Sequence, residues 1–131
     1  MQYLLLVYGC DRPEPGDPQF VEALERVNAF HAECRKRGVV LAWNVLRTVD
    51  TASTVRVRDG CTLITDGPFA ETYEQFGGYY LLDCDGVDEA LELAALCPMA
   101  QHGSVEVRPI AEVPGMQPAA NIERAAVAEG D

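Results

Sequence analysis

Two side chains in this sequence have the chemistry for proton transfer near neutral pH. Asp66 begins the run Asp-Gly-Pro-Phe, and His102 stands between Gln101 and Gly103 in a short loop segment. A histidine with an unperturbed pKa of about 6.5 can accept or release a proton, and a carboxylate can act as a general base or orient the imidazole. The alternative for Asp66 is structural, because its carboxylate can accept backbone N–H groups in an Asx-type turn. We predict Asp66 and His102 as the catalytic residues.

The residues expected to bind a ligand around this pair are Gly67, Phe69, Tyr8 and Arg47. Phe69 follows a proline and either anchors its loop by packing or forms the wall of a ligand site. The second histidine, His31, falls on the inward stripe of a predicted helix. A lone histidine in that position is usually a satisfied core residue, so we do not place it in the site.

Metal and disulfide chemistry have little support in the sequence. Two histidines, no HExxH motif and no clustered carboxylates give no basis for a built-in metal, and we expect no cofactor. The five cysteines form an odd set without CxxC spacing. We interpret them as reduced thiols that pack as small hydrophobic side chains.

Composition and charge exclude several classes of partner. The chain has 131 residues, of which 48% are hydrophobic and 24% charged, which indicates one soluble globular domain. Ten basic against twenty-one acidic residues give a net charge of −11, which disfavours nucleic acids. No apolar run approaches the roughly 20 residues that span a bilayer, and the start of the chain lacks the features of a secretory signal. We expect a cytoplasmic protein without a membrane partner.

The elements that must position Asp66 and His102 alternate along the chain. Short apolar runs predict strands over 3–8, 39–48, 77–82 and 104–109, and helices are predicted over 18–37 and from Gly86 to Pro98. The expected inward stripe of the first helix is Phe20, Leu24, Val27, His31 and Cys34, and that of the second is Val87, Ala90, Leu91, Ala94 and Ala95. Two β-rich runs joined by Asp59-Gly60 predict a hairpin with Val57 opposite Thr62 and Val55 opposite Ile64. Residues 70–75 are expected to form one helical turn, and 111–131 a flexible tail or short appended helix.

This order of elements matches a ferredoxin-like α+β domain, βαββαβ with an inserted hairpin, whose helices cover one face of an antiparallel sheet. With the first strand flanked by the third and fourth, the loops that carry Asp66 and His102 enter the same sheet edge, two strand spacings or roughly 9.5 Å apart. Tyr8, Gly9 and Arg47 should join that edge. The strands are apolar on both faces, so we expect a homodimer in which the uncovered face packs on a second sheet.

Five motifs in order resemble the YCII-related proteins of the DGPF type. They are Thr54-Val-Arg-Val-Arg-Asp-Gly, Thr65-Asp-Gly-Pro-Phe-Ala-Glu-Thr, Gly77-Gly-Tyr-Tyr-Leu, Asp88-Glu-Ala-Leu-Glu with Cys97-Pro98, and Gly103-Ser-Val-Glu-Val-Arg-Pro. The resemblance covers about residues 1–110 and implies a dimeric α+β barrel. It also implies a His-Asp active-site pair, which can be carried over only to Asp66 and His102, and a genetic link to alternative sigma factors.

Two functions follow from these observations. In the first, the chain is an enzyme or binder of a small organic molecule that uses Asp66 and His102 for proton transfer. In the second, it is a non-catalytic regulatory or interaction module whose partner is a sigma factor.

Overall fold

A four-stranded antiparallel sheet organises the chain, with the strand order β2-β5-β1-β6. The computed structural model describes residues 1–10 and 12–117. Within these residues the elements are β1 (Gln2–Gly9), α1 (Pro18–Arg37), β2 (Val40–Val45), the 3-10 helix η1 (Val49–Thr51), β3 (Ser53–Arg58), β4 (Cys61–Asp66), β5 (Gln75–Asp83), α2 (Val87–Leu96), the 3-10 helix η2 (Pro98–Gln101) and β6 (Ser104–Pro109).

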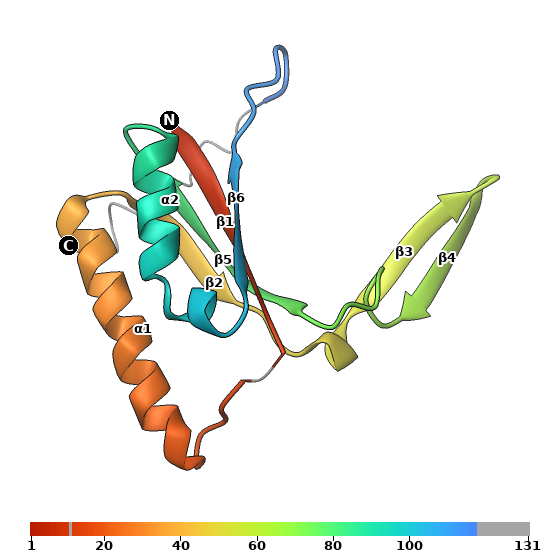
Figure 1. Cartoon of the computed structure of the whole chain (residues 1–131). Helices are drawn as coiled ribbons and strands as arrows, with labels where there is room; N and C mark the ends of the chain where they lie inside the picture. The colour runs from red at the N-terminus through yellow and green to blue at the C-terminus, as the bar shows by residue number, and fades with distance from the viewer. Residues whose placement is uncertain (11, 118–131) are drawn as a thin grey trace.

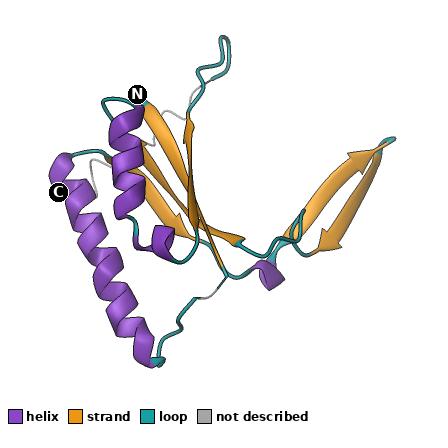
Figure 2. Cartoon of the chain, viewed as in Figure 1, coloured by secondary structure: helices purple, strands orange, loops and turns teal. Residues whose placement is uncertain are grey.

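The predicted ferredoxin-like arrangement is confirmed. β1 lies between β5 and β6 and is antiparallel to both, so β5 and β6 run parallel to each other. The two helices lie on the same side of this sheet (Figures 1 and 2). The second strand is shorter than expected, ending at Val45, and this leaves Arg47 in the loop beyond it.

The core lies between the helices and one face of the sheet. Alternate residues of β1, namely Tyr3, Leu5 and Val7, are buried, and Leu82 of β5 is completely so. This alternation follows from the twofold side-chain period of a strand. The remaining core residues come from both helices and the loops: Phe30, Cys34, Val39, Cys84, Ala90, Leu93, Ala94 and Cys97.

The other face of the sheet carries apolar side chains that no helix of the chain covers. Leu4 pairs with Leu81 and Leu6 with Tyr79 across β1 and β5, and all four are half-buried. Neighbouring side chains on the same strand face thus shield one another only in part. A second layer is needed to remove this face from water.

The helical stripes differ from the prediction. In α1 the buried residues are Phe30 and Cys34, whereas Leu24 is 45% exposed. The N-terminal half of this 20-residue helix extends past the part of the sheet it packs on (Figure 1), so an apolar residue there meets no core. In α2 Ala90 and Ala94 are buried as predicted, but Leu93 is buried as well, while Val87 and Leu91 are exposed. Helical spacing fits several neighbouring stripes, and packing selects one of them.

The inserted hairpin has the predicted register. Val57 pairs with Thr62 and Val55 with Ile64, and the turn places Asp59 at φ 52° and Gly60 at φ 76°. These positive φ angles are those of the type I′ turn that favours an Asp-Gly pair. The hairpin projects away from the rest of the fold as a separate two-stranded sheet (Figure 1), with exposed apolar side chains on β3 and β4.

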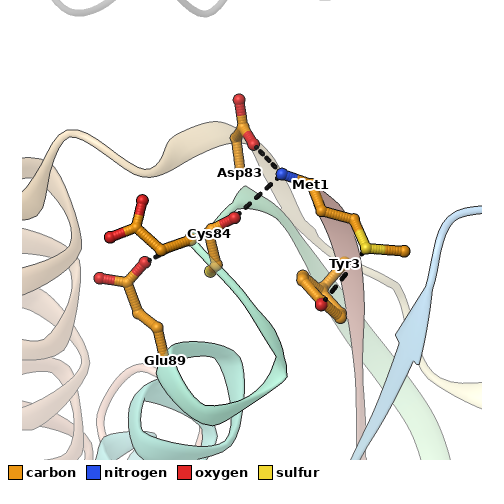
Figure 3. A network of polar contacts seen from close by, with 6 residues as sticks. Met1, Tyr3, Asp83, Cys84 and Glu89 are labelled. Atoms are coloured by element: carbon orange, nitrogen blue, oxygen red, sulfur yellow. Dashed lines mark hydrogen bonds and ion pairs between the residues drawn. The ribbon is translucent and has the colours of Figure 1, made fainter.

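Polar contacts fix one end of the sheet. The α-amino group of Met1 donates to the Asp83 carboxylate and to the Cys84 carbonyl, each at 3.0 Å (Figure 3). The Asp85 N–H donates to Glu89 in the first turn of α2 at 2.9 Å, where a carboxylate also suits the helix dipole. These contacts hold β1, β5 and α2 in place at the end of the sheet away from the predicted catalytic pair.

Two expectations for loops and the tail have different outcomes. Residues 70–74 form bends and irregular backbone, so the expected helical turn is wrong. Residues 111–117 form neither helix nor strand, and the rest of the predicted tail, 118–131, lies outside the described residues. None of the helices described is long and apolar enough to cross a membrane.

Candidate functional site

The starts of β5 and β6 flank the end of β1 at one end of the sheet. Tyr8 and Gly9 at the end of β1 pair with Ser104 at the start of β6 and Gln75 at the start of β5. The Ser104 hydroxyl donates to the carboxylate of Glu74 at 2.6 Å. The segment after the hairpin and the start of β6 are therefore linked directly.

Asp66 lies at the base of the hairpin, where it is exposed and pairs with Ser53. The turn after it is closed by other groups: the Gly67 N–H donates to the Ala52 carbonyl at 2.7 Å, and the Thr54 hydroxyl donates to the Gly67 carbonyl at 2.8 Å. Among the described residues the Asp66 carboxylate accepts no hydrogen bond, so the Asx-type cap is not formed.

His102 follows η2 and is exposed. Its backbone N–H donates to the Met99 carbonyl at 3.3 Å, and the next residue, Gly103, runs so close to β1 that a Cβ there would lie 2.0 Å from the Tyr8 carbonyl oxygen. No hydrogen bond or ion pair joins Asp66 to His102 in the part of the chain described. Their partnership stays a prediction.

The expected ligand-binding residues differ in their exposure and in their contacts. The half-buried Tyr8 packs against Phe76 with 5.5 Å between ring centroids. Phe69 is 76% exposed and lies 5.2 Å from the Arg56 guanidinium. Arg47 is exposed in the loop after β2. The arginine that holds this edge is one that sequence analysis missed, Arg12, which donates to the carbonyls of Leu46 at 2.7 Å and Gly77 at 3.2 Å.

A second group of chemically capable side chains is centred on His31. Its Nε2 lies 2.8 Å from the hydroxyl of Tyr80 on β5, and its ring stacks on Trp43 of β2 with 3.9 Å between centroids and 21° between planes. Phe30 meets Tyr80 edge-on at 5.2 Å. Side chains from α1, β2 and β5 thus converge, and His31 is half-buried rather than part of the closed core.

Burial sets the protonation state of this pair. It lowers the pKa of His31, and the positive charge of nearby Arg35 lowers it further. Burial also raises the pKa of the Tyr80 phenol well above its ordinary value. Both groups are therefore neutral at pH 7. The phenol can donate to Nε2 when the imidazole carries its proton on Nδ1, or accept when Nε2 is protonated, so the pair can relay a proton.

His31 borders a groove with a volume of about 710 Å³ between α1 and β2, lined by Asn28, His31, Ala32, Arg35, Lys36 and Trp43. This volume is in the range of small-molecule sites. The Arg35 guanidinium lies 5.2 Å from the Trp43 ring. Among the described residues of this lining, Arg35 and Lys36 are the charged ones, so this part of the groove is cationic in an acidic protein.

One feature of this groove is visible in the sequence, namely the spacing of its residues on α1. His31 and Arg35 are four residues apart and so share one helix face. Tyr80 and Trp43 could not be assigned to them, because the contacts join residues 49 and 12 positions distant from His31. No group of three or more His, Cys, Asp or Glu residues in 1–10 and 12–117 is arranged to hold a metal ion.

Comparison with known proteins assigns the family. The model of the YCII-related domain matches residues 1–114. The chain belongs to the YCII-related family. A protein of Rhizobium meliloti (strain 1021), named as uncharacterised, is 41% identical over 97 residues, covering 72% of this chain and 76% of that relative. The resemblance drawn from the five sequence motifs is thereby confirmed.

Proposed function

We propose that this YCII-domain protein binds a small organic molecule in the groove between α1 and β2, where His31, hydrogen-bonded to Tyr80, exchanges a proton with it. The observation that carries the proposal is the 2.8 Å contact between a neutral imidazole and a neutral phenol at the border of a groove of about 710 Å³. A neutral imidazole at pH 7 is ready to accept a proton, which is the requirement for a general base.

Variants of the two histidines test this location. Ligands found in a metabolite screen should bind the natural protein and His102→Ala alike, whereas His31→Gln should weaken binding or stop turnover. Tyr80→Phe keeps the ring but removes the hydroxyl, so it should reduce turnover more than binding. Loss of binding in His102→Ala with an unchanged His31→Gln would move the site to Asp66 and His102.

That second location is supported by one contact. The hydrogen bond between Ser104 and Glu74 joins the loop after the hairpin to the start of β6, two residues after His102. A ligand that draws the exposed side chains of Asp66 and His102 together would complete the pair predicted from the sequence. Asp66→Asn should then reduce activity as strongly as His102→Ala, since the two act as one unit.

The protein is proposed to act as a homodimer, with two sheets packed back to back into an α+β barrel. Support comes from the half-buried Leu4, Leu6, Tyr79 and Leu81 on the face that lacks helices. Sedimentation at micromolar concentration should give the mass of two chains, and Leu6→Asp should give one. A natural protein that stays a single chain at this dilution would contradict the proposal.

The regulatory alternative is favoured by the projecting hairpin. Val55, Val57 and Ile64 are each about 60% exposed or more, and such side chains suit a protein partner. A purified sigma factor encoded beside the gene should bind the natural protein, and a variant with Val55 and Ile64 changed to Ser should not bind it. Equal behaviour of both proteins would remove the hairpin from this role.

A further inference from the structure

We infer that the ligand of the α1–β2 groove is a small organic carboxylate, held by Arg35 and Lys36 beside His31; this inference rests on the function proposed above. It names the chemical class of the ligand, which the His31–Tyr80 contact by itself leaves open.

The basic residues on α1 differ in whether they form ion pairs. Arg26 forms an ion pair with Glu22 at 2.5 Å, and Arg37 pairs with Glu92 at 3.0 Å and with Glu33 at 3.9 Å. Arg35 and Lys36 form no ion pair within the described residues. Among the basic residues of α1, the two that line the groove are therefore the ones that no described carboxylate pairs with.

The charge of the groove lining contrasts with that of the rest of the chain. Twenty-one acidic residues outnumber ten basic ones, yet among the described residues no Asp or Glu lines this groove. A comparable groove of about 570 Å³ on another side of α1 contains both Arg26 and Glu33. Of these two grooves, the one at His31 has two cations and no carboxylate among its described lining residues, and an anionic ligand would complete it.

The position of Arg35 would place a bound ligand beside His31. Arg35 lies one turn after His31, and its guanidinium sits 5.2 Å from the Trp43 ring, which restricts the orientation of its planar donor fork. A carboxylate held by this fork brings the body of the ligand next to the imidazole. The flat rings of His31 and Trp43 favour a ligand whose body is also planar.

The position of the groove on α1 favours a carboxylate ligand over a phosphate. The groove residues on α1 belong to the C-terminal half of that helix, where the helix dipole presents partial negative charge. The Gly38 N–H that follows is already bonded to the Arg35 carbonyl at 3.0 Å. A monoanion meets less repulsion here than a phosphate dianion, and the backbone amide groups that usually cradle phosphate are not offered.

Two single reporters make the inference testable in the intact protein. Trp43 is the only tryptophan of the chain and Lys36 its only lysine, so tryptophan fluorescence and the NMR signal of a ¹³C-methylated lysine both report on this groove. Benzoate should perturb both signals with saturation. Benzamide, which has the same ring without the charge, should bind at least tenfold more weakly.

Variants complete the experiment. Arg35→Gln should weaken benzoate binding at least tenfold, Arg35→Lys should weaken it less, and the matched Arg26→Gln should leave it unchanged. Because Arg35 is exposed, these variants should keep the circular dichroism of the natural protein. Benzamide binding as tight as benzoate and dependent on His31 would overturn the carboxylate inference while leaving the proposed function intact.

The remaining outcomes are also decisive. Inorganic phosphate binding more tightly than benzoate in an Arg35-dependent manner would overturn the choice of a carboxylate. Absence of any response to benzoate at its solubility limit would overturn the inference as a whole. Loss of binding in His102→Ala, with both reporters silent, would instead refute the proposed location of the site.

Discussion

Nε2 of His31 lies 2.8 Å from the hydroxyl of Tyr80, and this contact joins α1 to the centre of the sheet. The two residues are 49 positions apart, so only the packed fold brings them together. The same imidazole stacks on Trp43 of the edge strand β2. One side chain therefore has both a structural and a chemical role, and the two roles can be separated by substitution.

Tyr80→Phe should lower the free energy of unfolding by about 1 kcal/mol, because it removes one partly buried hydrogen bond and leaves the ring in place. Urea denaturation measures the change. Tyr8→Phe is the matched control, since the Tyr8 hydroxyl forms no hydrogen bond within the described residues and its loss should have little effect. An equal loss of stability in both variants would argue against the His31–Tyr80 bond.

The stability of the protein should depend on pH through His31. The folded chain lowers the pKa of this imidazole, so as the pH falls below about 6.5 the unfolded chain takes up the proton first. The free energy of unfolding therefore decreases between pH 6.5 and the folded pKa, and this contribution is fully present above pH 6.5. Denaturation of His31→Gln from pH 8 to 5 should show a smaller decrease than the natural protein. Parallel curves would contradict the assignment.

The cysteines should divide into two reactivity classes. Burial raises the pKa of Cys34 to about 11 and that of Cys84 to about 11, and it also raises the pKa of buried Cys97. Thiols in this state are protonated and react slowly. Mass spectrometry after brief treatment with iodoacetamide at pH 8 should find label on exposed Cys10 and Cys61. Rapid labelling of Cys34 in the folded protein would contradict the packing of α1.

Two leucines should differ sharply in their contribution to stability. Leu5 is completely buried between the sheet and the helices, so Leu5→Ala should cost about 2–5 kcal/mol. Leu63 in the hairpin is 53% exposed, and Leu63→Ala should change stability by less than about 0.5 kcal/mol in the single chain. Chemical denaturation measures both. A large effect of Leu63→Ala would mean that the hairpin is covered in solution, for example by a partner.

Much of the fold could be predicted from local patterns. The Asp59-Gly60 pair set the turn of the hairpin, and with it the pairing of Val57 with Thr62. The apolar runs located the strands, and the predicted helix over 18–37 has the bounds found for α1. These features depend on backbone preferences and side-chain periods that a short segment carries by itself.

The candidate site was less accessible to prediction. The position of the starts of β5 and β6 on either side of β1 followed from the strand order, but the orientation of Asp66 and His102 depends on loops without regular structure. His31 was expected to be an inward-facing core residue. Its contacts with Tyr80 and Trp43, and the position of Arg35 over the Trp43 ring, arise from the way α1 lies across the sheet.

The amino-acid sequence by itself determined the order of the elements, the hairpin register, the acidic charge and the YCII family. Each of these depends on neighbouring residues or on the composition of the whole chain. Only the tertiary structure decided which helix residues are buried and which side chains surround His31. These are contacts between distant segments, and they follow from the angle and rotation at which α1 packs on β2 and β5, which no local pattern specifies.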